Sequence, residues 1–266
     1  MAYETILWET RDGVAQITLN RPDQLNALSI PMCQEMIDAL RVCQSDRTIR
    51  CVTLTGAGRA FCSGGDVKLM LESARKGAPE GERFLRELVF YLHGMISAIR
   101  RLEKPVIGSV NGVASGAGFS LALACDLVFA SDMAHFNQAY VKIGLSVDGG
   151  SSYFLTRHLG MKRAAEYFFT GEMIGAAKAF DLGIVNRVVP ADELERATFE
   201  FAAHLATGAT LAMGRTKMLL NSSLNESLET QMEFERQFIG QSTQTQDFAE
   251  GIRAFAEKRS PKFQSR

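Results

Sequence analysis

Residues 60–66 read AFCSGGD and come shortly after RCVTLT at residues 50–55, a run typical of a buried strand. Two consecutive glycines relax the backbone, so main-chain N–H groups of this loop can point at a ligand instead of into a sheet. Asp66 precedes a helical pattern at residues 67–74, where an aspartate is a good N-cap. On local pattern alone, a plain strand-to-helix loop with a capping aspartate explains the segment better than a binding loop.

A second glycine-rich segment, NGVASGAG at residues 111–118, has the same setting. It follows PVIGSV at residues 105–110, another buried-strand pattern, and leads into a small, apolar helix expected at residues 117–124. Small residues let the positive end of a helix approach a ligand closely. The alternatives are a packing helix that needs small residues, or a weak dinucleotide turn that lacks the full G-x-G-x-x-G spacing.

Strand and helix patterns alternate over the first 190 residues, which predicts an α/β fold. Further strands are expected at residues 5–9, 14–19 and 127–130, and further helices at residues 29–46 and 81–102. Strand signals vanish from about residue 191, and four helices are expected at residues 193–207, 211–219, 224–241 and 246–258. We therefore expect a core at residues 1–195 and a helical region at residues 196–266 that packs on this core, on a neighbouring subunit or on both.

The composition of the 266-residue chain excludes several classes of protein. A net charge of −1 gives no electrostatic reason for binding nucleic acid or an anionic membrane surface. The five cysteines form no CxxC pair or Cys/His cluster, which favours reduced thiols in a cytoplasmic protein and no metal site. No signal peptide and no membrane-spanning segment is expected.

Two such loops after successive buried strands are far more specific than either loop alone, and the chain resembles the crotonase superfamily of enoyl-CoA hydratases and isomerases. The resemblance covers nearly the whole chain and also rests on NRPDQLNAL at residues 20–28, ACDL at 124–127, AFDLGIVNRVV at 179–189 and EGIRAFAEKR at 250–259. It implies a crotonase (ClpP-like) spiral of repeated ββα units with a C-terminal helical trimerisation region. It also implies a homotrimer or a dimer of trimers.

The resemblance assigns roles residue by residue. The backbone N–H groups of Ser63 and Ala117 would form an oxyanion hole for the carbonyl of an acyl-CoA thioester, and Lys258 would reach the CoA phosphates of a neighbouring subunit. Coenzyme A would be part of the substrate, with no separate cofactor and no metal. Other residues would bind the substrate, namely Gln24, Asn26, Ala27, Ala60, Gly65, Asp66, Gly118 and Tyr140.

The chain departs from the family's hydratases at both glutamates that hold the reacting water. Ser120 and Tyr140 stand at or near those two positions, and neither can act as a carboxylate base. One acid remains in the matching segments, Asp148 in GLSVDGGS at residues 144–151. In this respect the chain resembles the isomerases of phenylacetate degradation, in which an aspartate at this place moves a proton between carbons. We therefore predict an enoyl-CoA isomerase with Asp148 as the acid/base.

Other interpretations stay open. Locally, Asp148 also suits a helix N-cap or an Asp-Gly turn. The eight-residue spacing of Tyr140 and Asp148 resembles the aryl-CoA dehalogenases of the superfamily, for which His93 on the long helix is a candidate water-activating residue. A hydratase or hydrolase with a different base, and an inactive CoA-binding scaffold, are the remaining alternatives. Residues 68–86 are expected to form a lid that shapes the acyl pocket.

Overall fold

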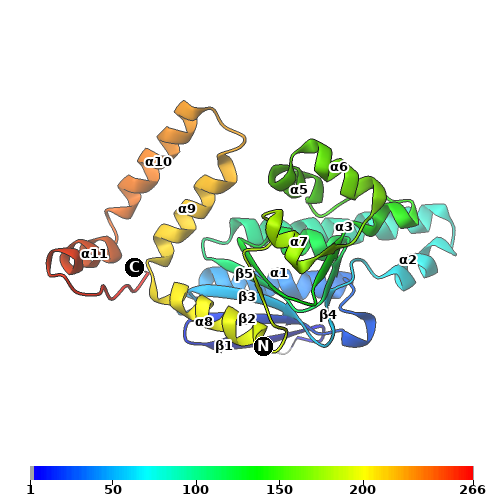
Figure 1. The fold of residues 1–266 in the computed structure, drawn as a ribbon, viewed down its shortest axis with the longest axis horizontal. Coiled ribbons are helices and arrows are strands. Elements are labelled where there is room, and N and C mark those ends of the chain that lie inside the picture. Colours follow the sequence, from blue (N-terminus) through cyan, green and yellow to red (C-terminus); the bar gives the residue numbers. More distant parts are fainter. Residues whose placement is uncertain (1–2, 266) are drawn as a thin grey trace.

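The computed structural model describes residues 3–265, and its main sheet has six strands in the order β1-β2-β3-β5-β7-β10 (Figure 1). β1 pairs with β2 antiparallel, and the other neighbours in the sheet are parallel. These strands are β1 (Ile6–Arg11), β2 (Val14–Leu19), β3 (Cys51–Gly56), β5 (Val106–Val110), β7 (Leu127–Ser131) and β10 (Arg187–Val189). β5 (VIGSV) is buried along its whole length, as its largely apolar sequence predicts.

A second sheet of four very short strands runs beside the first, in the order β4-β6-β8-β9. The strands are β4 (Ala60–Cys62), β6 (Val113–Ser115), β8 (His135–Asn137) and β9 (Ile174–Gly175). The sequence predicted glycine-rich loops at β4 and β6 and no element at β8 or β9, because two or three residues are too few to show a strand periodicity. Main-sheet strand, short strand and helix follow one another three times along the chain, which confirms the predicted α/β spiral of ββα units.

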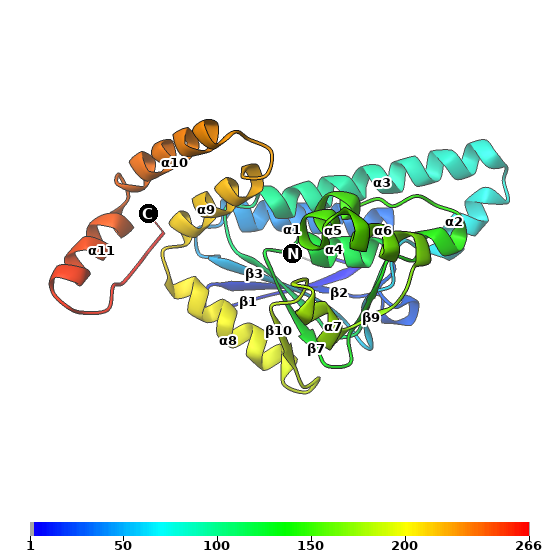
Figure 2. The same cartoon turned by 45° about the horizontal axis from the view of Figure 1, so that its top comes forward.

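Helices cover both faces of the main sheet (Figure 2). α1 (Ile30–Ser45) and the long α3 (Ala78–Arg101) lie side by side, and α8 (Leu194–Thr207) packs on the main sheet through a separate apolar cluster. α1 begins where the sequence predicts, because the hydroxyl of Ser29 accepts a hydrogen bond from the N–H of Met32 at 3.4 Å. The other helices near the core are α2 (Val67–Ala74), α5 (Ser151–Leu159), α6 (Met161–Thr170) and α7 (Ala176–Asp181).

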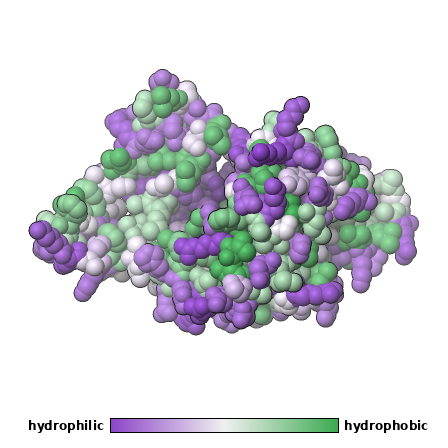
Figure 3. Space-filling view, in the orientation of Figure 1, coloured by the Kyte–Doolittle hydropathy of each residue, from purple (hydrophilic) through white to green (hydrophobic). Residues whose placement is uncertain are grey.

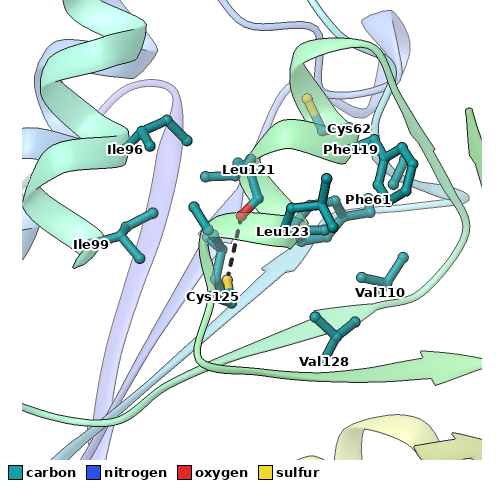
Figure 4. Packing of buried hydrophobic residues seen from close by; sticks show 14 of the residues in the cluster. Phe61, Cys62, Ile96, Ile99, Val110, Phe119, Leu121, Leu123, Cys125 and Val128 are labelled. Carbon is teal, nitrogen blue, oxygen red and sulfur yellow. Dashed lines mark hydrogen bonds between the residues drawn. The ribbon is translucent and has the colours of Figure 1, made fainter. Parts of the chain in front are cut away.

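α4 (Ala117–Ala124) lies at the centre of the core, and each of its residues is buried. Figure 4 shows Leu121 between Ile96 and Ile99 of α3 and the sheet residues Val110 and Val128. A helix that is buried on all sides is apolar nearly all round, as α4 is apart from Ser120, whose hydroxyl is hydrogen-bonded. The packing fixes the N-terminus of α4 rigidly, which matters for the site described below.

The last three helices extend from the body as an arm (Figure 1). They are α9 (Thr210–Ser222), α10 (Leu228–Ser242) and α11 (Gln246–Ala256). Because α8 lies on the sheet, the arm begins after Thr207, and the expected division at residue 195 falls inside the first turn of α8. No helix within residues 3–265 has the length and apolar character needed to cross a lipid bilayer.

The arm exposes large apolar side chains, and Figure 3 shows such groups open to solvent along it. They are Leu220, Leu224, Leu228, Met232, Ile239, Phe248, Ile252 and Phe255, and Phe255 is 87% exposed. A surface of this kind on one chain indicates an interaction site. Packing of this region on a neighbouring subunit stays a prediction.

A buried charge cluster joins the arm to the body. Lys217 of α9 is only 5% exposed, and its Nζ contacts the carboxylate of Asp126 at 2.8 Å and donates to the carbonyl oxygen of Ile99 at 2.7 Å. Asp126 also accepts hydrogen bonds from Arg100 at 3.2 Å and from the N–H of Val106 at 2.8 Å. The carboxylate therefore neutralises two cations that the fold has largely removed from water.

Replacing Asp126 with alanine is expected to destabilise the fold strongly, because it leaves Lys217 buried without its counter-charge. The free energy of unfolding, measured by urea denaturation, should fall by about 3 kcal/mol or more. The matched control is Glu233→Ala, which breaks the exposed ion pair with Arg236 on α10 and should leave the free energy of unfolding nearly unchanged. Equal effects of the two substitutions would contradict the structural role of the cluster.

Candidate active site

A cavity of about 170 Å³ lies where the loop after β4 meets the N-terminus of α4. Five of the residues predicted for the site line it together, although they come from four separate segments of the chain: Ser63, Gly65, Ala117, Tyr140 and Asp148. Apolar side chains make up most of the remaining wall, and they are Leu28, Val67, Met70, Leu85, Leu88, Val89, Leu92, Ile143 and Leu145. The cavity is thus an apolar pocket with a few polar groups, the usual form of a ligand site.

The structure changes one member of the predicted pair of amide donors. The backbone N–H of Ser63 donates to the carbonyl oxygen of Leu25 at 3.0 Å, so this hydrogen is not available to a ligand. The N–H of Gly65, two residues later, has no acceptor within residues 3–265, and Gly65 lines the cavity. The assignment of Ser63 as a donor therefore needs correction, and Gly65 is the residue of this loop with a free amide.

The direction of the Gly65 amide follows from a short parallel bridge with Leu28. The N–H of Leu28 donates to the carbonyl oxygen of Gly64 at 2.7 Å, and the N–H of Asp66 donates to the carbonyl oxygen of Leu28 at 3.1 Å. In a planar trans peptide the C=O and N–H bonds point in opposite directions. The Gly65 N–H therefore points away from Leu28, toward the side on which the cavity lies.

The Ala117 amide is free for a different reason. Ala117 is the first residue of α4, where the N–H groups of the first turn have no partner inside the helix, and no acceptor for it occurs in the described chain. The dipole of the helix adds positive potential at this end. The preceding Gly116 adopts φ 52°, and its own N–H is held by the carbonyl oxygen of Asn137 at 2.9 Å.

Glycines bring the two turns into contact. Gly64 has φ 103°, and a Cβ atom there would lie 2.9 Å from the carbonyl oxygen of Ser115 and 3.6 Å from the nitrogen of Ala117. A side chain at position 64 would therefore clash and cover the Ala117 amide. Gly118 is equally constrained, since a Cβ there would lie 2.1 Å from the carbonyl oxygen of Cys62 in β4. The free amides of Gly65 and Ala117 thus lie on adjoining turns at one wall of the cavity.

Asp148 is the only carboxylate among the described residues that line the cavity. The hydroxyl of Tyr140 donates to its Oδ1 at 2.5 Å, and the hydroxyl of Ser120 donates to its backbone carbonyl oxygen at 3.1 Å. Burial raises the pKa of the Asp148 carboxyl above its ordinary value, although the Tyr140 hydrogen bond and His93 oppose this shift. A carboxylate with a raised pKa is suited both to accept and to return a proton.

The loop that carries Asp148 packs closely on α4. A Cβ atom at Gly149 would lie only 2.7 Å from Cβ of Ser120, and Gly149 adopts φ 60°. Its N–H donates to Nε2 of His93 at 3.3 Å. The small side chain at position 120 is therefore what lets this loop approach α4 and hold Asp148 at the cavity.

Several predicted binding residues do not line the cavity. Asn26 is completely buried and donates to the carbonyl oxygens of Ala57 at 2.9 Å and Ala60 at 2.8 Å, so its side chain joins two loops. Asp66 is 5% exposed and caps α2 as predicted, accepting from the N–H of Lys68 at 3.2 Å. Both side chains support the site from behind.

The remaining predicted contacts lie elsewhere. Gln24 is exposed near Ser63, whose hydroxyl donates to the carbonyl oxygen of Gln24 at 3.5 Å, while Ala27 and Ala60 are buried beneath this surface. Lys258 follows α11, which lies at the end of the arm in Figure 1. It is not among the residues that line the cavity of its own chain. Contacts of these residues with CoA stay predictions.

The apolar wall supplied by α3 was missed from the sequence. Leu85, Leu88, Val89 and Leu92 lie three and four residues apart, the spacing of one face of a helix. That periodicity was available in the sequence, but it cannot tell a pocket wall from an ordinary core face. Of the lid expected at residues 68–86, Met70 and Leu85 reach the cavity.

Comparisons with known proteins agree with this geometry. The model of the enoyl-CoA hydratase/isomerase family matches residues 9–266. A protein of Rhodobacter capsulatus named "Probable enoyl-CoA hydratase" is 40% identical over all of both chains. The 1,2-epoxyphenylacetyl-CoA isomerase of Escherichia coli is 38% identical over 98% of each chain, and the 4-chlorobenzoyl coenzyme A dehalogenase-2 of an Arthrobacter species is 36% identical over 94% of this chain and 90% of its own.

Solved structures show the same fold. The crystal structure of an enoyl-CoA hydratase from Polaromonas sp. JS666 superposes with a TM-score of 0.91 at 37% identity, covering 97% of this chain and 98% of that one. The relatives' names include a hydratase, an isomerase and a dehalogenase. The comparisons therefore do not decide which of these reactions the chain catalyses. That choice must rest on the residues of the cavity.

The pKa of Asp148 offers a direct test of the site. Because the Tyr140 hydrogen bond stabilises the charged carboxylate, Tyr140→Phe should raise the Asp148 pKa further above that of an exposed aspartate. The measurement is a pH titration of the carboxyl carbon by NMR. Tyr153→Phe, on the outward side of α5, is the control and should leave the titration unchanged. A lower Asp148 pKa in Tyr140→Phe would refute the predicted contact.

Proposed function

Because the chain belongs to the enoyl-CoA hydratase/isomerase family, we propose that this acyl-CoA enzyme is an enoyl-CoA isomerase with Asp148 as its acid/base. One observation carries the proposal. Asp148 is the single carboxylate among the described residues of the cavity wall, and the same cavity is bordered by the free amides of Gly65 and Ala117.

In the proposed mechanism, the two amides bind the carbonyl oxygen of the thioester. Negative charge develops on that oxygen when a proton leaves the neighbouring carbon. Donors that are already in place need not be reoriented during the reaction. Each such donor stabilises the transition state by about 3–4 kcal/mol. Gly65 takes the role first predicted for Ser63, because its N–H is unpaired and that of Ser63 is not.

Asp148 then completes the reaction by moving a single proton, and no water is consumed. As a carboxylate it takes a proton from the α-carbon of a 3-enoyl thioester, which leaves a dienolate held by the two amides. As a carboxylic acid it returns that proton to the γ-carbon, which moves the double bond into conjugation. Burial favours the neutral form of Asp148 and so assists the return.

The same geometry weighs against hydration by a pair of glutamates. Ser120 and Tyr140 carry no carboxylate, and both are hydrogen-bonded to the Asp148 segment. Displacement of halide from an aryl thioester is the strongest competing reaction, since Tyr140 contacts Asp148 and His93 lies against Gly149. In that reaction Asp148 would attack the aromatic ring as a nucleophile and would not act as an acid/base.

Replacing Asp148 with asparagine should lower the rate of 3-enoyl-CoA isomerisation by about 100-fold or more, because a general acid–base is worth that much. Formation of the conjugated thioester is followed by ultraviolet absorbance. Wild type should create this absorbance from a 3-enoyl-CoA and leave that of crotonyl-CoA unchanged. Loss of the crotonyl-CoA absorbance would indicate hydration, and halide release from 4-chlorobenzoyl-CoA would indicate dehalogenation. Activity of Asp148→Asn within about twofold of wild type would remove Asp148 from the mechanism.

We further propose that three chains assemble through the arm, so that Lys258 reaches the CoA phosphates of a neighbour. The exposed apolar side chains of α9–α11 support this assembly. A cytoplasmic location is supported by five free, buried cysteines.

Light scattering should therefore give a mass of three or six times the 29.2 kDa of one chain. Phe255→Asp, at the most exposed apolar position, should shift the mass toward that of a monomer, since a charge cannot be buried there without cost. Phe169→Asp, at a similarly exposed position on α6, is the matched control. A monomeric wild type would contradict the assembly.

A further inference from the structure

Arg21 lies behind the glycine-rich loop and joins two segments of the site. Its Nη1 donates to the carbonyl oxygen of Ala27 at 2.5 Å, and its Nη2 donates to Oδ2 of Asp66 at 2.8 Å. The side chain is only 18% exposed. Nothing in the proposed mechanism uses Arg21, and it does not line the cavity.

The hydrogen bond to Ala27 is the first step of a continuous chain of polar groups. The carbonyl of Ala27 and the N–H of Leu28 belong to one peptide group, and this N–H donates to the carbonyl oxygen of Gly64 at 2.7 Å. The carbonyl of Gly64 and the N–H of Gly65 belong to the next. Two planar peptide groups in series therefore connect the guanidinium of Arg21 to the free amide of Gly65.

We propose that Arg21 is a positioning residue that orients and polarises the Gly65 amide through these two peptide groups. The inference rests on the proposed function, in which Gly65 is an oxyanion donor. A cation at the start of a hydrogen-bond chain strengthens the first bond, and each polarised group strengthens the next. The positive end of the chain is the Gly65 N–H that faces the cavity.

The two oxyanion donors thus obtain their positive potential from different sources. Ala117 begins α4 and receives it from the helix dipole. Gly65 precedes the N-cap of α2 and belongs to an extended bridge, so its N–H is not one of the first-turn amides of a helix. Arg21, at the start of the chain of peptide groups behind Gly65, polarises this N–H instead.

The pair with Asp66 holds the guanidinium in place for this role. Asp66 is 5% exposed, also caps α2, and donates its own N–H to the carbonyl oxygen of Leu28 at 3.1 Å. A largely buried ion pair adds little to the stability of a fold, because the loss of hydration offsets the attraction. Arg21 bonds the peptide group before Leu28 and Asp66 bonds the one after it, and this arrangement is better explained by a positioning role.

The test measures the polarity of the hole without any turnover. Butyryl-CoA with a ¹³C-labelled thioester carbonyl has no double bond to move, and its C=O stretch shifts to lower frequency when donors polarise the oxygen. Difference infrared spectra are recorded for wild type, Arg21→Met, Arg21→Lys and Arg50→Met. Arg50 is the control, since it is also partly buried and donates to two backbone carbonyls, those of Phe263 and Gly208, but does not line the cavity.

Arg21→Met should reduce the downshift of the bound carbonyl by about 10–30%, Arg21→Lys should be intermediate because it keeps the charge, and Arg50→Met should keep the full shift. In Arg21→Met, the kcat for isomerising an enoyl-CoA substrate should fall about tenfold while KM changes less than about threefold, since the lost interaction acts mainly in the transition state. If Arg21→Met does not fold, Arg21→Lys carries the same test.

The outcomes separate this inference from the proposed function. A full downshift in Arg21→Met that binds butyryl-CoA overturns the role of Arg21. The absence of a downshift in wild type overturns the oxyanion hole and the inference with it. A wild-type downshift that Arg21→Met weakens, in a protein that does not isomerise 3-enoyl-CoA, supports the role of Arg21 and overturns the isomerase assignment alone.

Discussion

The parallel bridge between Leu28 and Gly65 is the contact on which the site depends. It joins two loops 37 positions apart and leaves the N–H of Gly65 unpaired and pointing away from Leu28, toward the cavity. Hydrogen bonds hold the bridge on both sides, because Asn26 and Arg21 anchor the first loop and Asp66 anchors the second. A free amide in a flexible loop would turn to solvent, whereas this one is fixed before any ligand arrives.

A second constraint is the approach of α4 to β4. Gly118 contacts the backbone of Cys62 so closely that any side chain would separate the two elements. This contact sets the position of the Ala117 amide relative to Gly65, while the apolar packing around α4 prevents the helix from shifting along its axis. The two donors therefore share one rigid frame, although the sequence places them 52 residues apart.

The elements of this frame were predictable to different degrees. β2, α2 and α4 match their expected bounds, since β2 alternates, Asp66 caps α2, and α4 is a compact run of small and apolar residues after a glycine-rich turn. The short strands of the second sheet carry no such signal. The choice between Ser63 and Gly65 as donor was not readable from their loop, because it depends on which amide finds the carbonyl of Leu25. Likewise, nothing local shows that the side chain of Asn26 is buried.

The position of the carboxylate, more than the oxyanion hole, determines which reaction this fold performs. In the proposed mechanism, the amides of Gly65 and Ala117 would stabilise negative charge on the thioester oxygen whatever step places it there, so they fit every activity named among the relatives. With serine at position 120, α4 offers no acid, and the space beside it is taken by the loop of Asp148 and Gly149. One carboxylate, held by a tyrosine and raised in pKa by burial, can move a proton between two carbons but lacks the second acid that would hold a water with it. The small residues Ser120 and Gly149 are thus what places Asp148 at the cavity, and the proposed chemistry depends on them as well.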